Sequence, residues 1–226
     1  MIYGLGLLFL FLLVYGPQLW VRFVMWRYSK DLDGMPGTGG ELANHLVKTL
    51  NLEGVTVKEG PPGANYYSPD EKVVCLDARL YNGKSLTAVA VAAHEIGHAI
   101  QFTREEPISK LRKKYMGTAL VIKKVGAVLL MISPIIFALL KIPHVLLANV
   151  AIGVLVLIAS ALMYLAVLPE EYDASFNKAL PILESGYVPE KHMPAVRSVL
   201  KAAALTYFAA ALADSIRLWR LLRYLR

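Results

Sequence analysis

The residues best suited to chemistry are His94, Glu95 and His98, which form an HExxH pattern within the segment SLTAVAVAAHEIGHAIQF. In a helix, positions i and i+4 share a face, so the two histidines can bind one metal ion together. Glu95 follows the first histidine, where its carboxylate can reach a water bound to that metal. Zinc lowers the pKa of such a water, and a carboxylate can then take its proton. The pattern therefore predicts one catalytic Zn²⁺ ion, with His94 and His98 as ligands and Glu95 as the general base.

The residues around this pattern predict the helix that must position it. Alanine and valine dominate the flanks, and Ser85 is a suitable N-cap. Burying two histidines and a glutamate in an otherwise apolar helix would cost folding free energy if these polar groups had no partners. A metal ion supplies the missing partner, which favours a metal site over an ordinary polar helix surface.

A catalytic zinc site needs a third protein ligand and an open position for water. The acidic segment PEEYDAS, residues 169–175, is the best candidate, because the long apolar run before it returns the chain to the side of the membrane that the histidines are expected to occupy. The start of a solvated acidic helix is the alternative interpretation of this cluster. The residues alone leave open which carboxylate would bind.

The chain resembles the membrane-anchored neutral zinc metallopeptidases of the YugP type, found in bacteria and archaea. The resemblance rests on VAAHEIGHAIQ, the apolar hairpin after it and LPEEYDAS, and it extends to GMPGTGGELANHLVKTLNLEGV, YNGKSLTAVAVAAHEIGHAIQ and KAAALTYFAAAL. It covers nearly the whole chain, including the N-terminal anchor. It implies a membrane-anchored zinc endopeptidase that hydrolyses peptide bonds in peptides or in unfolded or membrane proteins.

A more distant similarity, to HtpX-type and prenyl-protein-processing gluzincins, implies the identity of the third ligand. In those enzymes a glutamate in an E-x-x-x-D helix binds the metal, and this places the role on Glu171. The aspartate of that pattern orients a ligand histidine, and Ser175 stands at its position here. Asp173 is an alternative to Glu171, although two residues away it faces another side of the helix. Ser175 and Asp173 are therefore candidates for residues that contact the metal ligands and orient them.

The remaining histidines have more ordinary interpretations. His192, in VPEKHMPAV, lies on the same predicted side as the metal site and is a candidate for stabilising the transition state, but a loop histidine is the commoner case. His45 is expected on a helix surface. His144 is expected on the far side of the membrane, where it cannot join the site.

The composition excludes several classes of protein. The chain has 226 residues, of which 56% are hydrophobic and 18% are charged, whereas disordered chains combine low hydrophobicity with high charge. Cys75 is the single cysteine, so neither a disulfide framework nor a Cys-rich zinc ribbon can form; it is expected to be a small buried residue. The net charge is +7, and the positions of the charged residues along the chain favour a lipid bilayer as the partner. No nucleic-acid partner is expected.

Three apolar runs predict membrane-spanning helices. Residues 2–21 carry no charge and end in an aromatic and basic border, which is typical of an uncleaved anchor. Residues 125–140 and 142–169 predict a transmembrane hairpin with a tight turn at residues 141–144. A fourth run, residues 202–213, is short, so it either spans or lies at the membrane surface with the basic tail. We therefore expect a multi-pass protein of the cell membrane with three or four spans.

The basic residues predict the orientation of the spans, because cytoplasmic loops carry an excess of lysine and arginine. Ten basic residues border the polar region, and Lys141 lies on the opposite side. The ten are Arg22, Arg27, Lys30, Arg104, Lys110, Arg112, Lys113, Lys114, Lys123 and Lys124. This bias places the active site in the cytoplasm. The four arginines of the tail would lie outside if residues 202–213 spanned, which favours three spans.

The polar region supplies turn signals, one helix and two or three short strands ahead of the HExxH helix. The expected fold class is an α-helical membrane protein with a small α+β zincin-like catalytic domain, in which the HExxH helix packs beside a short β-sheet. The expected parts are an N-terminal membrane anchor (1–30), the cytoplasmic zincin-like domain (31–115), the transmembrane hairpin (116–169), the third-ligand helix and loop (170–195) and a C-terminal apolar helix with a basic tail (196–226).

In the zinc peptidases that this chain resembles, a strand just upstream of the metal helix is the exposed edge of a small sheet. The resemblance therefore implies that residues 73–76 form such an edge, where an extended substrate could pair with it. Two other functions compete with a cytoplasmic endopeptidase. A non-catalytic zinc-binding membrane scaffold would have no use for Glu95. An intramembrane protease would need a longer apolar stretch before His94, and charges follow at residues 104–106. The sequence indicates no oligomeric state.

Overall fold

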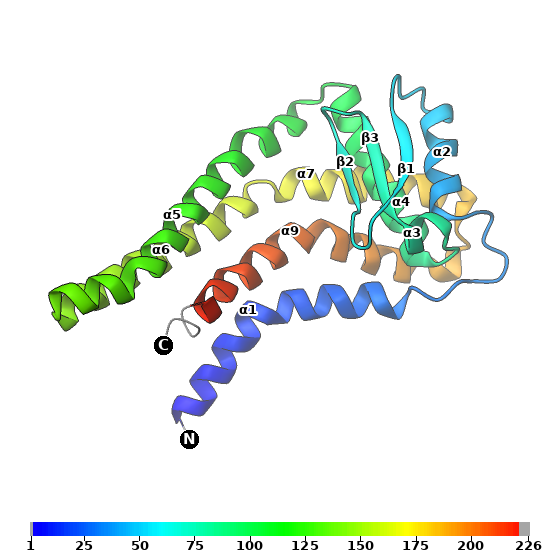
Figure 1. Ribbon diagram of the computed structural model, residues 1–226. Helices are drawn as coiled ribbons and strands as arrows, with labels where there is room; N and C mark the ends of the chain where they lie inside the picture. Colours follow the sequence, from blue (N-terminus) through cyan, green and yellow to red (C-terminus); the bar gives the residue numbers. More distant parts are fainter. Residues whose placement is uncertain (1, 222–226) are drawn as a thin grey trace. The chain divides into compact units, whose positions relative to one another are not determined.

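The computed structural model describes the backbone of residues 2–221 and the side chains of residues 12, 15–112, 114–142, 144–153, 155–156, 158–159 and 162–209. The chain divides into two compact units. The sheet unit comprises residues 19–110 and 169–206, and the hairpin unit comprises residues 1–18, 111–168 and 207–226. Figure 1 shows the elements of both along the chain, most of them helices.

A three-stranded sheet lies in the sheet unit, with the order β1-β3-β2. Strand β1 (Thr56–Gly60) runs parallel to β3 (Val73–Asp77), and β2 (Tyr66–Ser68) runs antiparallel to it. Cys75, in the middle of β3, is 1% exposed, as predicted.

The expectation that residues 73–76 form the exposed edge of this sheet is wrong. A hairpin turn brings β2 to one side of β3, while β1 pairs with the other side, so the backbone groups of β3 are already used. The free edges belong to β1 and β2. A proline at Val74 or Cys75 would therefore remove a hydrogen-bond donor from the central strand and disrupt the sheet itself.

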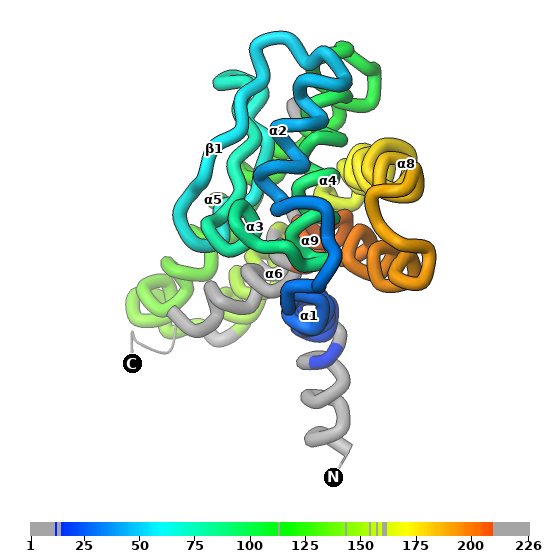
Figure 2. Tube along the Cα trace, turned by 90° about the vertical axis from the view of Figure 1, so that its right-hand side faces the viewer, coloured from blue at the N-terminus to red at the C-terminus, as the bar shows by residue number. Residues whose placement is uncertain are grey.

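Helix α4 (Leu86–Thr103) carries the HExxH pattern and is buried continuously from Leu86 to Gln101. The Ser85 hydroxyl caps it by accepting a hydrogen bond from the backbone N–H of Ala88, as the sequence predicted. In Figure 2, which is turned by 90°, α4 lies between the strands on one side and the segment around α8 on the other. This central position fits the largely apolar composition of α4, whose buried polar residues are Thr87, Gln101 and those of the HExxH pattern.

The other elements of the sheet unit enclose α4. Helix α2 (Gly39–Thr49) begins with a capping box between Thr38 and Glu41 and packs against α4. The remaining helical segments in and beyond this unit are α1 (Ile2–Arg27), α3 (Ala78–Asn82), η1 (Pro107–Ser109), α7 (Leu168–Tyr172), η2 (Asp173–Ala179), α8 (Leu180–Ile182), η3 (Leu183–Tyr187), η4 (Glu190–His192) and α9 (Met193–Leu221). That the sheet unit is zincin-like stays a prediction.

The hairpin unit contains α5 (Lys110–Leu140) and α6 (Pro143–Leu165), joined by the tight turn that the sequence predicted. The two helices share a polar contact: the Asn149 side chain donates hydrogen bonds to the Leu129 carbonyl at 2.8 Å and to the Ser133 hydroxyl at 2.6 Å. Many large apolar side chains of both helices are exposed.

Among the described residues, one helical stretch, Pro107–Leu140, is long and apolar enough to cross a membrane, and 17% of its apolar window is buried. His144–Gly153 is a shorter apolar stretch. The first predicted span, residues 2–21, and the C-terminal run with its tail lie largely outside the residues whose side chains are described.

Candidate metal centre

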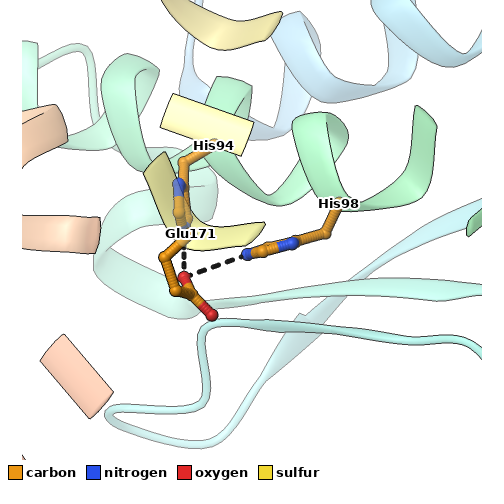
Figure 3. Close-up of side chains that lie close together, drawn as sticks. All are labelled: His94, His98 and Glu171. Carbon is orange, nitrogen blue, oxygen red and sulfur yellow. Dashed lines mark hydrogen bonds and ion pairs between the residues drawn. The ribbon is translucent and has the colours of Figure 1, made fainter. Parts of the chain in front are cut away.

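Three side chains meet between α4 and α7, and they are the three that the sequence and its resemblances selected. His94 and His98 lie one turn apart on α4, and Glu171 comes from α7 (Figure 3). The Glu171 Oε2 atom is 3.4 Å from His94 Nε2 and 3.2 Å from His98 Nε2. All three side chains are buried, and their candidate ligand atoms lie within 4.8 Å of one another.

The Ser175 hydroxyl fixes the tautomer of His94. It donates its single hydrogen to the Leu200 carbonyl of α9 at 3.1 Å. The hydroxyl oxygen, 2.9 Å from His94 Nδ1, must therefore accept from an Nδ1–H group. The lone pair of His94 Nε2 then faces Glu171. Ser175 thus occupies the place behind a ligand histidine that the distant similarity assigned to an aspartate.

The Gln101 amide fixes the tautomer of His98 in the same way. Its Nε2 group donates to the Glu170 carbonyl at 2.9 Å and to Asp173 Oδ2 at 2.8 Å, which uses both amide hydrogens. The amide oxygen, 3.0 Å from His98 Nδ1, must accept from an Nδ1–H group. The lone pair of His98 Nε2 therefore also faces Glu171.

The centre is thus a buried meeting point of three electron-pair donors. Two imidazole lone pairs and a carboxylate oxygen repel one another in a dry environment unless a cation or an added proton lies among them. Two histidines and one carboxylate are also the ligand set of many catalytic zinc sites. The residues present therefore fit a zinc ion.

Glu95 differs from the other buried carboxylates of the site. It is 6% exposed, and within the described part of the chain no hydrogen bond or ion pair joins its carboxylate to another residue. A carboxylate without a protein partner and with slight access to solvent can accept a proton from water. This arrangement suits the role of general base that the sequence predicted.

Gly97 sets the distance between α4 and the segment that carries Glu171. A Cβ atom at this position would lie 2.5 Å from the Ala174 carbonyl oxygen and 3.0 Å from the Ala174 Cα atom. No side chain larger than hydrogen fits there without moving the η2 backbone. Gly97 therefore allows the close packing that brings Glu171 and Ser175 to the two histidines.

We expect Gly97→Ala to lower both stability and zinc content. Alanine normally stabilises a helix interior over glycine by about 0.5–1 kcal/mol, but here the overpacking against Ala174 should cost about 1–3 kcal/mol. Thermal unfolding and elemental analysis of the purified variant measure the two effects. Gly117→Ala in α5 is the control, because a Cβ atom there meets nothing within 4 Å. Equal behaviour of both variants would contradict the packing role of Gly97.

The sequence did not single out Gln101, and it named Glu170 only as part of the acidic segment 169–175. Gln101 lies three positions after His98, on the same helix face, and this spacing was the available signal. Glu170 directly precedes Glu171; its carbonyl holds Gln101, and its Oε1 atom is 3.9 Å from His98 Nδ1.

Asp173 lies behind Gln101 and does not join the three candidate ligands. Burial alone would raise the pKa of its carboxyl group. Hydrogen bonds from Gln101 and Asn177, together with the Lys178 ammonium, outweigh this effect and lower the pKa below its ordinary value. Asp173 is therefore a charged acceptor that faces the Gln101 amide.

The other histidines lie elsewhere. His192 is at the end of η4, and none of the side-chain contacts described for this structure joins it to the metal centre, so its role in the transition state stays a prediction. His45 lies exposed on α2, where its ring contacts the Thr49 hydroxyl.

Comparisons with known proteins agree with this chemistry. The family described as "Putative neutral zinc metallopeptidase" matches residues 3–226. The chain is 31% identical over 226 residues to "Putative membrane protease YugP" of Bacillus subtilis (strain 168), an alignment that covers 96% of this chain and 95% of the relative. No solved structure matches the chain significantly.

Proposed function

Because the chain belongs to the family of neutral zinc metallopeptidases, we propose that it is a membrane-anchored endopeptidase with one catalytic Zn²⁺ ion held by His94, His98 and Glu171. The observation that carries this proposal is the convergence of two Nε2 lone pairs and one carboxylate oxygen in a buried site. Its substrates would be peptides or unfolded or membrane proteins.

Different residues of the chain have different roles in peptide hydrolysis. A bound zinc ion supplies a Lewis acid that polarises a carbonyl and lowers the pKa of water. Ser175 and Gln101 accept hydrogen bonds from the Nδ1–H groups of the histidines, so both Nε2 lone pairs face Glu171, where the ion would bind. Glu95 accepts the proton of the attacking water on its carboxylate and passes it to the leaving amine nitrogen.

The ligand count favours catalysis over the alternative of a zinc-binding scaffold. Structural zinc sites have four protein ligands, whereas catalytic sites have three and keep one open position. The cluster found among the described residues has three members, and Glu95, directly after His94, makes no hydrogen bond or ion pair with another described residue.

The direct test uses the purified protein in detergent. Its zinc content is measured, and casein digestion is followed before metal removal, after it and after zinc is returned. We expect digestion to be lost and regained with the metal. Digestion that persists in fully metal-free protein would contradict the proposal.

We also propose that the protein crosses the cell membrane several times with its active site in the cytoplasm. The exposed apolar side chains of α5 and α6 support membrane insertion, the ten basic residues that border the polar region support the orientation, and the Bacillus subtilis relative is named a membrane protease.

Cysteine labelling tests this orientation. Asp70 lies in an exposed turn, and the natural Cys75 is buried, so Asp70→Cys creates one accessible thiol. In intact bacterial cells an impermeant maleimide should leave this variant unlabelled, and permeabilisation should expose it. His144→Cys, at the exposed turn of the hairpin, should label in intact cells. The reverse pattern would show that the active site faces outward.

A further inference from the structure

A chain of polar contacts continues from His98 through Gln101 to residues nearer the surface. Lys178 Nζ lies 3.6 Å from Asp173 Oδ2 and 2.9 Å from Glu106 Oε2. The backbone N–H of Glu106 donates to the Gln101 carbonyl at 2.9 Å, just beyond the end of α4. The Asn177 side chain donates to Asp173 Oδ1 at 2.8 Å. Gln101 is thus held at its backbone from one side and at its amide from the other.

These contacts allow one orientation of the Gln101 amide. If the amide were turned over, its oxygen would face the Asp173 carboxylate and the Glu170 carbonyl, and no hydrogen would lie between these acceptors. Its NH₂ group would then point at His98 Nδ1 and drive the imidazole toward the tautomer that carries its proton on Nε2. In a side chain that is fully buried, acceptors left facing one another are costly. Asp173 and the Glu170 carbonyl therefore fix the orientation of the Gln101 amide, and the amide fixes the tautomer of the His98 imidazole.

We propose that Gln101 is a positioning residue of the zinc centre, which presents the His98 Nε2 lone pair to the metal, and that Asp173 holds Gln101 in the orientation this requires. The inference rests on the proposed function, because it concerns how His98 binds zinc. A carboxylate is the common partner of a metal-binding histidine. Here the Asp173 carboxylate does not contact His98 directly. It binds the neutral Gln101 amide, and the amide contacts His98.

The test compares zinc affinities, measured by competition with a chelator at equilibrium, in three variants of the full chain. Gln101→Met keeps the length of the side chain but removes its acceptor and donors, so zinc should bind about 10–100-fold more weakly. Asp173→Ala, at a less buried position, should cause a smaller loss in the same direction, and it provides the measurement if Gln101→Met does not fold.

The third variant combines Gln101→Glu with Asp173→Asn. It retains an oxygen opposite His98 Nδ1 and restores a donor–acceptor pair between positions 101 and 173, while the Glu170 carbonyl loses the hydrogen bond that Gln101 donates. We therefore expect it to bind zinc more tightly than Gln101→Met, although it carries one substitution more. The absorption spectrum of the cobalt(II) form should resemble the wild type in the double variant and differ in Gln101→Met, because the spectrum reports the geometry at the metal.

The outcomes separate this inference from the proposed function. Wild-type protein that binds no zinc would overturn the proposed function. Wild-type protein that binds zinc while Gln101→Met and Asp173→Ala bind it equally well, with unchanged cobalt spectra, would overturn the role of Gln101 alone.

Discussion

Glu95→Gln should abolish most peptide hydrolysis while leaving the zinc in place. The amide cannot accept the proton of the attacking water, and loss of a general base costs about 10²–10⁴-fold in rate. The substitution preserves the size of the side chain, and Glu95 makes no hydrogen bond or ion pair with another described residue, so folding should not depend on its charge. Casein digestion and elemental analysis of the same preparation measure the two properties together.

Glu105→Gln is the matched control, because this glutamate is exposed beyond the end of α4. It should keep wild-type activity. Undiminished cleavage by Glu95→Gln would remove Glu95 from the mechanism. Loss of zinc from the same variant would instead show that its carboxylate supports metal binding.

Glu171→Ala should cause the largest loss of zinc among the acidic residues of the site. It removes the one carboxylate oxygen that lies close to both Nε2 atoms. Losing a residue behind a ligand already costs about 10–100-fold in metal affinity, and losing the ligand itself should cost at least as much. Elemental analysis after dialysis against a weak chelator measures the effect.

Glu190→Ala, at an exposed glutamate of the same unit, is the control and should retain full zinc. Glu170→Ala and Asp173→Ala decide between the neighbouring carboxylates. If either lost more zinc than Glu171→Ala, the assignment of the third ligand would be wrong.

Local interactions made part of the structure predictable. The HExxH pattern, the apolar flanks of α4 and its Ser85 cap lie within a few turns of one another, so spacing alone predicts that His94 and His98 share a face. The hairpin turn after α5 was predictable for the same reason, since the apolar runs end there and Pro143 begins the next helix.

Contacts between distant segments were harder to predict. Nothing within residues 73–77 indicates that β1 pairs with one side of β3 and β2 with the other, and the expected edge strand is in fact the central one. The choice among Glu170, Glu171 and Asp173 depends on how η2 packs against Gly97, and the residues alone left it open. Gln101 was missed because its partners lie about seventy residues further along the chain.

The burial of α4 also bears on the order of events when the protein is made. His94 and His98 lie on a helix enclosed by the sheet on one side and by η2 on the other, and Glu171 lies in α7, directly before η2, so the three donor atoms come together only when these elements have packed. We therefore expect zinc to bind late in folding and to stabilise the packing of η2 against α4, since metal binding and folding are coupled.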